Sequence, residues 1–146
     1  GFNSISDYES LIYNLPNEHP QIRFSTLVVK RSGPHVAEVS GTIFFKKLVR
    51  LNVKELIDFR KERLKNYSYE VYLDREKQYW YDDQPHPKDP TLQSTFPHHK
   101  HVPPGIKHHR IPAPGLSFAQ PNLPFLIQEI LAHFFSQEAK QEAKSE

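Results

Sequence analysis

The sequence predicts a single α+β domain in which an antiparallel five-stranded meander carries an N-terminal and a C-terminal helix on one face. Three observations support this fold class. Short runs that alternate between apolar and polar residues fill the region 21–83. An amphipathic helical pattern precedes them, and a second one follows near the C-terminus. With 146 residues, the chain has the length of one ordinary domain, and we expect residues 1–146 to form it.

The first helix is predicted at residues 7–14. Ser6 and Glu9 have the spacing of a capping box, in which each side chain bonds the backbone N–H of the other residue. Apolar residues follow at helical spacing, and Pro16 disfavours helical backbone at Leu15.

Five strands are expected between this helix and residue 83. The first two, IRFSTLVVKR and VAEVSGTIFF, are joined by Ser32-Gly33-Pro34, which is typical of a hairpin. In the third, LVRLNVKELIDF, one side carries Leu51, Val53, Glu55 and Ile57. NYSYEVYLD and KQYWYDD complete the set. Their short connections favour antiparallel pairing, and their alternation indicates one buried face and one exposed face.

A proline-rich segment without a clear period, residues 85–121, follows the strands. Segments of this length are usually functional or disordered. We expect this one to be ordered, because proline lowers the entropy lost on folding. The apolar side chains that offer anchors are Phe96, Val102, Ile106, Ile111, Leu116 and Phe118.

The C-terminal helix is predicted to begin after Asn122, which is a good N-cap, with Pro124 in its first turn. Its apolar stripe consists of Leu123, Leu126, Ile127, Ile130, Leu131, Phe134 and Phe135. The sheet face is the expected partner of this stripe.

Composition excludes several classes of protein. The chain has no cysteine, which excludes disulfides, thiolate nucleophiles and zinc–sulfur sites and fits a cytoplasmic location. No apolar run approaches the roughly 20 residues of a membrane span, so no membrane partner is expected. The net charge of +2 is too small to indicate nucleic-acid binding by itself.

The stretch STFPHHKHVPPGIKHH, residues 94–109, concentrates histidine beside lysine. It lies in a longer acid-free region, residues 90–128, which is a candidate anion-binding surface. If HHKH is extended, His99 and His101 lie on one side about 7 Å apart, and His98 and Lys100 lie on the other.

Three interpretations of these histidines remain open. In the first, they bind a metal ion, and Asp82, Asp83 or His86 supply the remaining ligands. In the second, they transfer protons beside a lysine that binds an anion. In the third, they only pack a loop that its prolines make rigid. Because no regular set of four ligands is apparent, we expect no tightly bound structural metal and no other cofactor. The tyrosines and Trp80 of the last two strands offer either a surface for stacking RNA bases or cross-strand packing pairs.

Residues 36–101 resemble the TumE-like family, the toxin half of small bacterial toxin–antitoxin pairs. The resemblance rests on GTIFFKKLVRLNVKELIDF, YSYEVYLD, YWYDDQPHP and TFPHHKH, in this order. The family pattern ends a strand with Tyr/Trp-Asp-Asn-x-Pro-His-His and continues with Thr-Phe-Pro-His-His-Lys-His. The second motif matches fully at residues 95–101, whereas Asp83 and Pro87 replace the Asn and the second His of the first.

The resemblance implies a toxin and an antitoxin partner. From the residue types we infer a metal-independent ribonuclease, in which histidines act as acid and base and a lysine stabilises the charged phosphorane. The expected catalytic residues, on one concave surface, are His86, His98, His101, Lys100 and Asp82. The alternative is a non-catalytic module that binds protein or RNA, so enzymatic activity is left open, as is a homodimer.

Overall fold

The structure is a computed structural model that describes residues 1–145, with side chains described as far as Ser136. Helix α1 spans Ile5–Glu18, and helix α2 spans Leu123–Ser145. A short 3₁₀ helix, η1, spans Pro90–Thr95. Within the described part of the chain, no helix combines the length and the apolar character that a membrane crossing requires.

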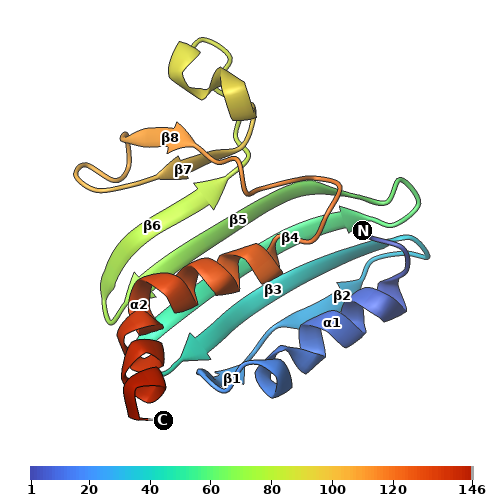
Figure 1. Cartoon of the computed structure of the whole chain (residues 1–146). Helices are drawn as coiled ribbons and strands as arrows, with labels where there is room; N and C mark the ends of the chain where they lie inside the picture. The colour runs from blue at the N-terminus through green and yellow to red at the C-terminus, as the bar shows by residue number, and fades with distance from the viewer. Residues whose placement is uncertain (146) are drawn as a thin grey trace.

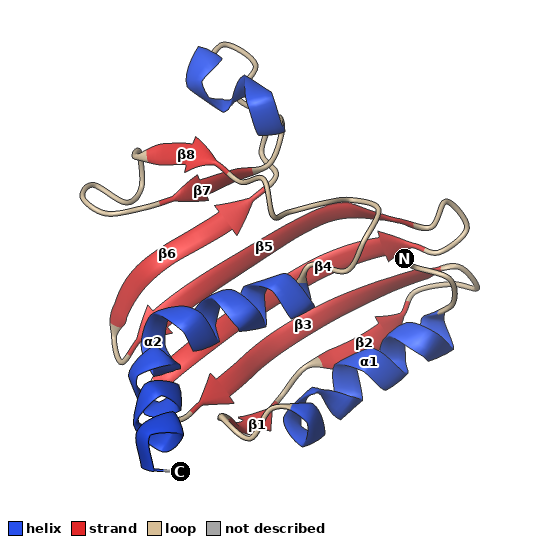
Figure 2. Cartoon of the chain, viewed as in Figure 1, coloured by secondary structure: helices blue, strands red, loops and turns tan. Residues whose placement is uncertain are grey.

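Eight strands form one antiparallel sheet over the described residues. They are β1 (Ile22–Ser25), β2 (Val28–Arg31), β3 (Val36–Phe45), β4 (Val49–Asp58), β5 (Arg63–Leu73), β6 (Glu76–Asp82), β7 (His99–His101) and β8 (Arg110–Pro112). Their order is β1-β3-β4-β5-β6-β7-β8, and β2 also pairs with β3. From β3 to β8 each strand therefore pairs with the one that follows it in the chain, which is the predicted meander (Figure 2).

The predicted fold class is confirmed, but five strands is an undercount. The first expected strand is divided into β1 and β2, and two further strands, β7 and β8, lie in the proline-rich segment. The division falls opposite Gly41 of β3, where a Cβ atom would lie only 2.6 Å from the carbonyl oxygen of Thr26. Strands β7 and β8 have three residues each, which is too short for alternation to reveal a strand.

Both helices cover the same face of the sheet, as predicted (Figure 1). Tyr8 of α1 donates a hydrogen bond to Glu55 of β4, and Tyr69 of β5 donates one to the other oxygen of that carboxyl. Asn122, immediately before α2, donates to the Tyr69 hydroxyl. Glu55 is buried, with 3% of its surface exposed. This polar chain therefore ties the sheet to α1 and to the start of α2 inside an otherwise apolar core.

Helix α1 is longer than predicted at both ends. Its N-cap is Ser4, whose side chain accepts a hydrogen bond from the backbone N–H of Asp7, so the capping box at Ser6 does not form. Pro16 lies inside the last turn and does not end the helix before Leu15. Leu15 is buried on the sheet, and this packing outweighs the local cost of the proline.

The start of α2 and its apolar stripe are confirmed. The fully buried residues of the stripe are Leu123, Leu126, Ile127 and Ile130. Within the proline-rich segment, Leu116 is buried as expected, together with Leu92. Phe96 and Ile111 are wrong as anchors, because 44% and 38% of their surfaces are exposed.

Candidate histidine–aspartate site

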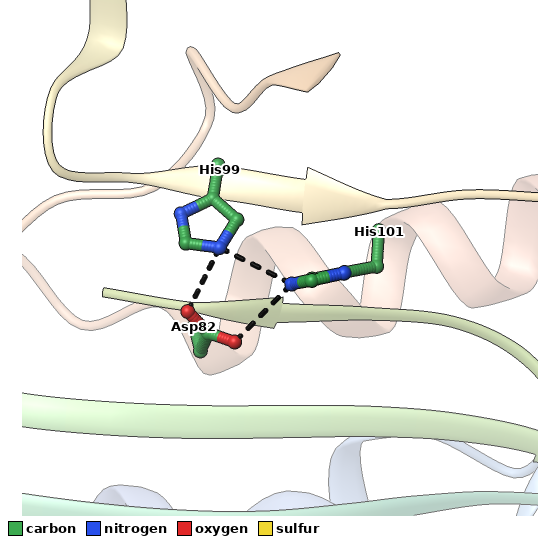
Figure 3. A group of neighbouring side chains, drawn as sticks. All are labelled: Asp82, His99 and His101. Carbon is green, nitrogen blue, oxygen red and sulfur yellow. Dashed lines mark hydrogen bonds and ion pairs between the residues drawn. The ribbon is translucent and has the colours of Figure 1, made fainter. Parts of the chain in front are cut away.

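The pairing of β7 with β6 brings two histidines and an aspartate together. Trp80 lies opposite His101, and Asp82 lies opposite His99. Because partners in an antiparallel pair point to the same face, these four side chains lie together on the face that the helices leave uncovered. Figure 3 shows both imidazoles reaching from β7 to the carboxylate at the end of β6.

The ligand atoms of the cluster, defined as Asp82, His99 and His101, converge on a small volume. His99 Nε2 lies 2.9 Å from Asp82 Oδ1, and His101 Nε2 lies 3.3 Å from Asp82 Oδ2. The two Nε2 atoms are 3.2 Å apart. The histidines are almost fully buried, at 1% and 4% exposure. Such a concentration of nitrogen and oxygen atoms out of water requires compensating interactions.

Groups around the cluster hold each of its members in place. His99 Nδ1 lies 3.1 Å from the carbonyl oxygen of Pro97, and His101 Nδ1 lies 3.0 Å from that of Ile106. A carbonyl oxygen only accepts, so each Nδ1 carries the proton and donates it, which leaves Nε2 of a neutral ring as an acceptor.

Asp82 is held in the same way. Its Oδ2 accepts from the indole N–H of Trp80 at 3.1 Å, and its Oδ1 accepts from the backbone N–H of Gln84 at 3.0 Å. Burial alone would raise the pKa of Asp82, but His99, which donates from Nε2 when its ring is protonated, and the hydrogen bond from Trp80 lower that pKa well below its usual range. Asp82 therefore stays a carboxylate at neutral pH.

His86 connects the cluster to a surface cavity. Its ring lies edge to face with that of His99, with centroids 4.9 Å apart. The cavity has a volume of about 620 Å³, and its lining includes His86, Lys88, Arg110 and one acid, Asp89. Arg110 Nε is buried without a hydrogen-bond partner among the described residues. Lysine and arginine beside imidazole make this cavity suited to an anion.

The structure does not bring the five predicted catalytic residues onto one surface. Asp82 and His101 meet in the cluster, and His86 lies beside it. Lys100 lies opposite Tyr81 on the helix-covered face, where its Nζ is 3.2 Å from Glu129 Oε2. His98 stacks against Tyr67 and accepts or donates a hydrogen bond at the Tyr67 hydroxyl. The expectation that all five residues share one surface is therefore wrong, because the side chains of an extended segment alternate between faces.

Two residues of the site were absent from the predicted set. His99 is the partner of Asp82, and Arg110 lines the cavity. The signal for His99 was the alternation that puts it on the same side as His101. The signal for Arg110 was its place in the acid-free region.

The fold and the site define a small α+β protein with a buried histidine–aspartate cluster beside a cationic cavity. The chain belongs to the TumE toxin family, because the family model described as Toxin TumE matches residues 9–134. This match confirms the resemblance and extends it from residues 36–101 into both helices. No match was found among curated proteins or among solved structures.

Proposed function

We propose that the protein is the toxin of a toxin–antitoxin pair and that it cleaves RNA at the cluster and the adjoining cavity. The observation that carries this proposal is the cavity lined by His86, Lys88 and Arg110 beside the buried Asp82–His99–His101 cluster. The family supports the toxin role, for which an antitoxin is the expected partner.

The chemistry of RNA cleavage suits these groups. The 2′-hydroxyl loses its proton and its oxygen attacks phosphorus; the bond to the 5′-oxygen breaks and that oxygen takes up a proton. Charge builds on the phosphoryl oxygens in the transition state, where Arg110 and Lys88 are available to stabilise it. His86 is the imidazole that reaches the cavity, and we assign it proton transfer with the RNA. We assign to Arg110 the stabilisation of the charged phosphorane that was expected of Lys100.

A cleavage assay with purified, tag-free chain tests the proposal. The substrate is single-stranded RNA of mixed sequence, with Mn²⁺ or Zn²⁺ added in parallel, and the products are examined for 2′,3′-cyclic phosphate ends. Arg110→Gln should lower kcat/KM by about 100-fold to 1,000-fold, the typical effect of losing one transition-state contact. Arg75→Gln, in the exposed turn between β5 and β6, is the matched control and should cleave like wild type.

Circular dichroism establishes that each variant is folded. If folded wild type leaves the RNA intact under all these conditions, RNA cleavage is wrong. If Arg110→Gln cleaves as fast as wild type, the cavity is not the substrate site. In the first case a non-catalytic module, which binds its partner through the same surface, becomes the better description.

A further inference from the structure

We propose that Asp82, His99 and His101 bind one divalent transition-metal ion, with a coordination position left open for water or substrate. Metal binding at the cluster does not depend on RNA cleavage; only the part that the ion would play in catalysis rests on the proposed function.

The hydrogen bonds of the two imidazoles leave their inner nitrogens without protons. Both Nδ1 atoms donate to backbone carbonyls, at Pro97 and at Ile106, so in the neutral rings both Nε2 atoms carry lone pairs. These lone pairs lie 3.2 Å apart and face a carboxylate. Three acceptors that converge in this way repel one another unless a positive charge lies between them. A metal ion supplies that charge and replaces the missing donors.

The spacing of the ligand atoms suits such an ion. Zinc binds nitrogen and carboxylate oxygen at about 2.0–2.2 Å, so two ligands lie about 2.9 Å apart at a right angle and about 3.4 Å apart at the tetrahedral angle. The two Nε2 atoms are 3.2 Å apart, and each lies 2.9 or 3.3 Å from a different oxygen of Asp82, so each of these contacts falls in that range. One ligand atom from each residue lies within 4.8 Å of those of the other two.

The surroundings have the second layer of contacts that metal sites use. A histidine ligand usually donates its outer N–H to a carbonyl or carboxylate, and here both do so. The carboxylate is oriented by the indole N–H of Trp80 and the backbone N–H of Gln84. Trp80 also lies flat against the ring of His101. These contacts fix all three ligands before an ion arrives.

The ligand set indicates which ions fit. Two imidazoles and one carboxylate suit zinc and similar first-row ions, whereas calcium and magnesium prefer oxygen ligands. Three protein ligands with an open position are typical of a catalytic site. The proposed ion departs from the sequence-based expectation of no tightly bound metal, which rested on the lack of a regular set of four ligands. In RNA cleavage the ion would act as a Lewis acid on a phosphoryl oxygen or on bound water.

Zinc binding by the tag-free chain tests the proposal. After treatment with a chelator and dialysis, wild type should take up about one equivalent of Zn²⁺ by elemental analysis and isothermal titration calorimetry. His99→Ala and Asp82→Asn should each weaken binding at least about 100-fold. The matched control is His98→Ala, which removes the neighbouring histidine from the opposite face of the same segment. A double change of the exposed His108 and His109 to alanine controls for loose binding at the surface.

Cobalt provides a measurement that needs no variant of the cluster. The d–d absorption of Co²⁺ bound to wild type should be strong, as for four or five ligands, and should disappear on addition of one equivalent of Zn²⁺. Absence of bound zinc in folded wild type would overturn the metal site. So would zinc binding that survives in folded Asp82→Asn but is lost in the His108 and His109 double variant.

Failure of the metal site and failure of RNA cleavage give different results. If zinc binds at the cluster but no RNA is cleaved, the metal-site proposal stands and the ribonuclease proposal is wrong. If chelator-treated chain binds no zinc but cleaves RNA, the ribonuclease proposal stands and the metal-site proposal is wrong. In that case a proton lies between the imidazoles and the carboxylate.

Discussion

Trp80 lies face to face with His101, with ring centroids 3.8 Å apart and an angle of 14° between the planes. The same indole donates its N–H to Asp82. One side chain therefore fixes two of the three proposed metal ligands, although it binds no metal itself. We regard Trp80 as the positioning residue of the cluster.

Replacing Trp80 with phenylalanine separates its two roles. The change keeps an aromatic ring against His101 and removes the hydrogen bond to Asp82. Zinc affinity should fall about 10-fold to 100-fold, as is typical when a group that orients a ligand is lost. Calorimetric titration measures the affinity, and Tyr72→Phe, on the same open face but away from the cluster, should bind like wild type. Equal zinc affinity in Trp80→Phe and wild type would show that the indole N–H does not orient Asp82.

The buried Glu55 should make stability depend on pH. Burial raises the pKa of Glu55 above its ordinary value of 4.5, and hydrogen bonds from Tyr69 and Tyr8 offset only part of that rise. The folded state then binds the proton more tightly than the unfolded state. The stabilisation that this bound proton gives to the folded state is complete below pH 4.5 and is lost as pH rises through the folded-state pKa of Glu55.

Glu55→Gln removes this titration. The variant should be less stable than wild type at pH 4, because one tyrosine hydroxyl loses its acceptor. The difference should shrink as pH rises, since only wild type then carries a buried charge. Urea unfolding between pH 4 and pH 8 measures both free energies, with Glu38→Gln on the exposed face as the control. A constant difference across this range would show that Glu55 keeps the same charge in both states.

Gly41 should tolerate no side chain. Its φ is +134°, and a Cβ atom would come within 2.6 Å of the backbone oxygen of Thr26, where β1 gives way to β2. Gly41→Ala should lower the free energy of unfolding by about 3–5 kcal/mol, through backbone strain and crowding together.

Gly33→Ala is the matched control for this change. Gly33 has a similar φ of +149°, but no atom lies within 4 Å of the added Cβ. Its cost should be about 1–2 kcal/mol from strain alone. Similar urea midpoints for the two alanine variants would mean that the contact with Thr26 relaxes without cost.

Sequence reasoning reached the fold because periodicity is a local property. The alternation of Leu51, Val53, Glu55 and Ile57 assigns β4 and its buried face before any partner is known. The same reasoning fails for β8, because its three residues form a strand only through their pairing with β7.

The candidate site was harder to predict because it depends on contacts between distant residues. Alternation alone placed His99 and His101 on one side. Which of the nearby acids they meet depends on the register of β7 against β6, and the intervening segment 83–98 sets that register through contacts that no local pattern reveals. The place of His98 beside Tyr67, 31 residues earlier, is likewise a tertiary contact.

Because β7 points side chains to both faces of the sheet, the site depends on the register of β7 against β6 as much as on the residues that β7 contains. Residues 98–101 send side chains alternately to the helix-covered face and to the open face. A one-residue slip of β7 against β6 would reverse that assignment without changing a single histidine. His98 and Lys100 would then face Asp82, and two imidazoles would be forced against Tyr81 and Glu129. A homologue that retains every letter of the HHKH motif but pairs this strand one residue out of register would carry the motif and lack the site.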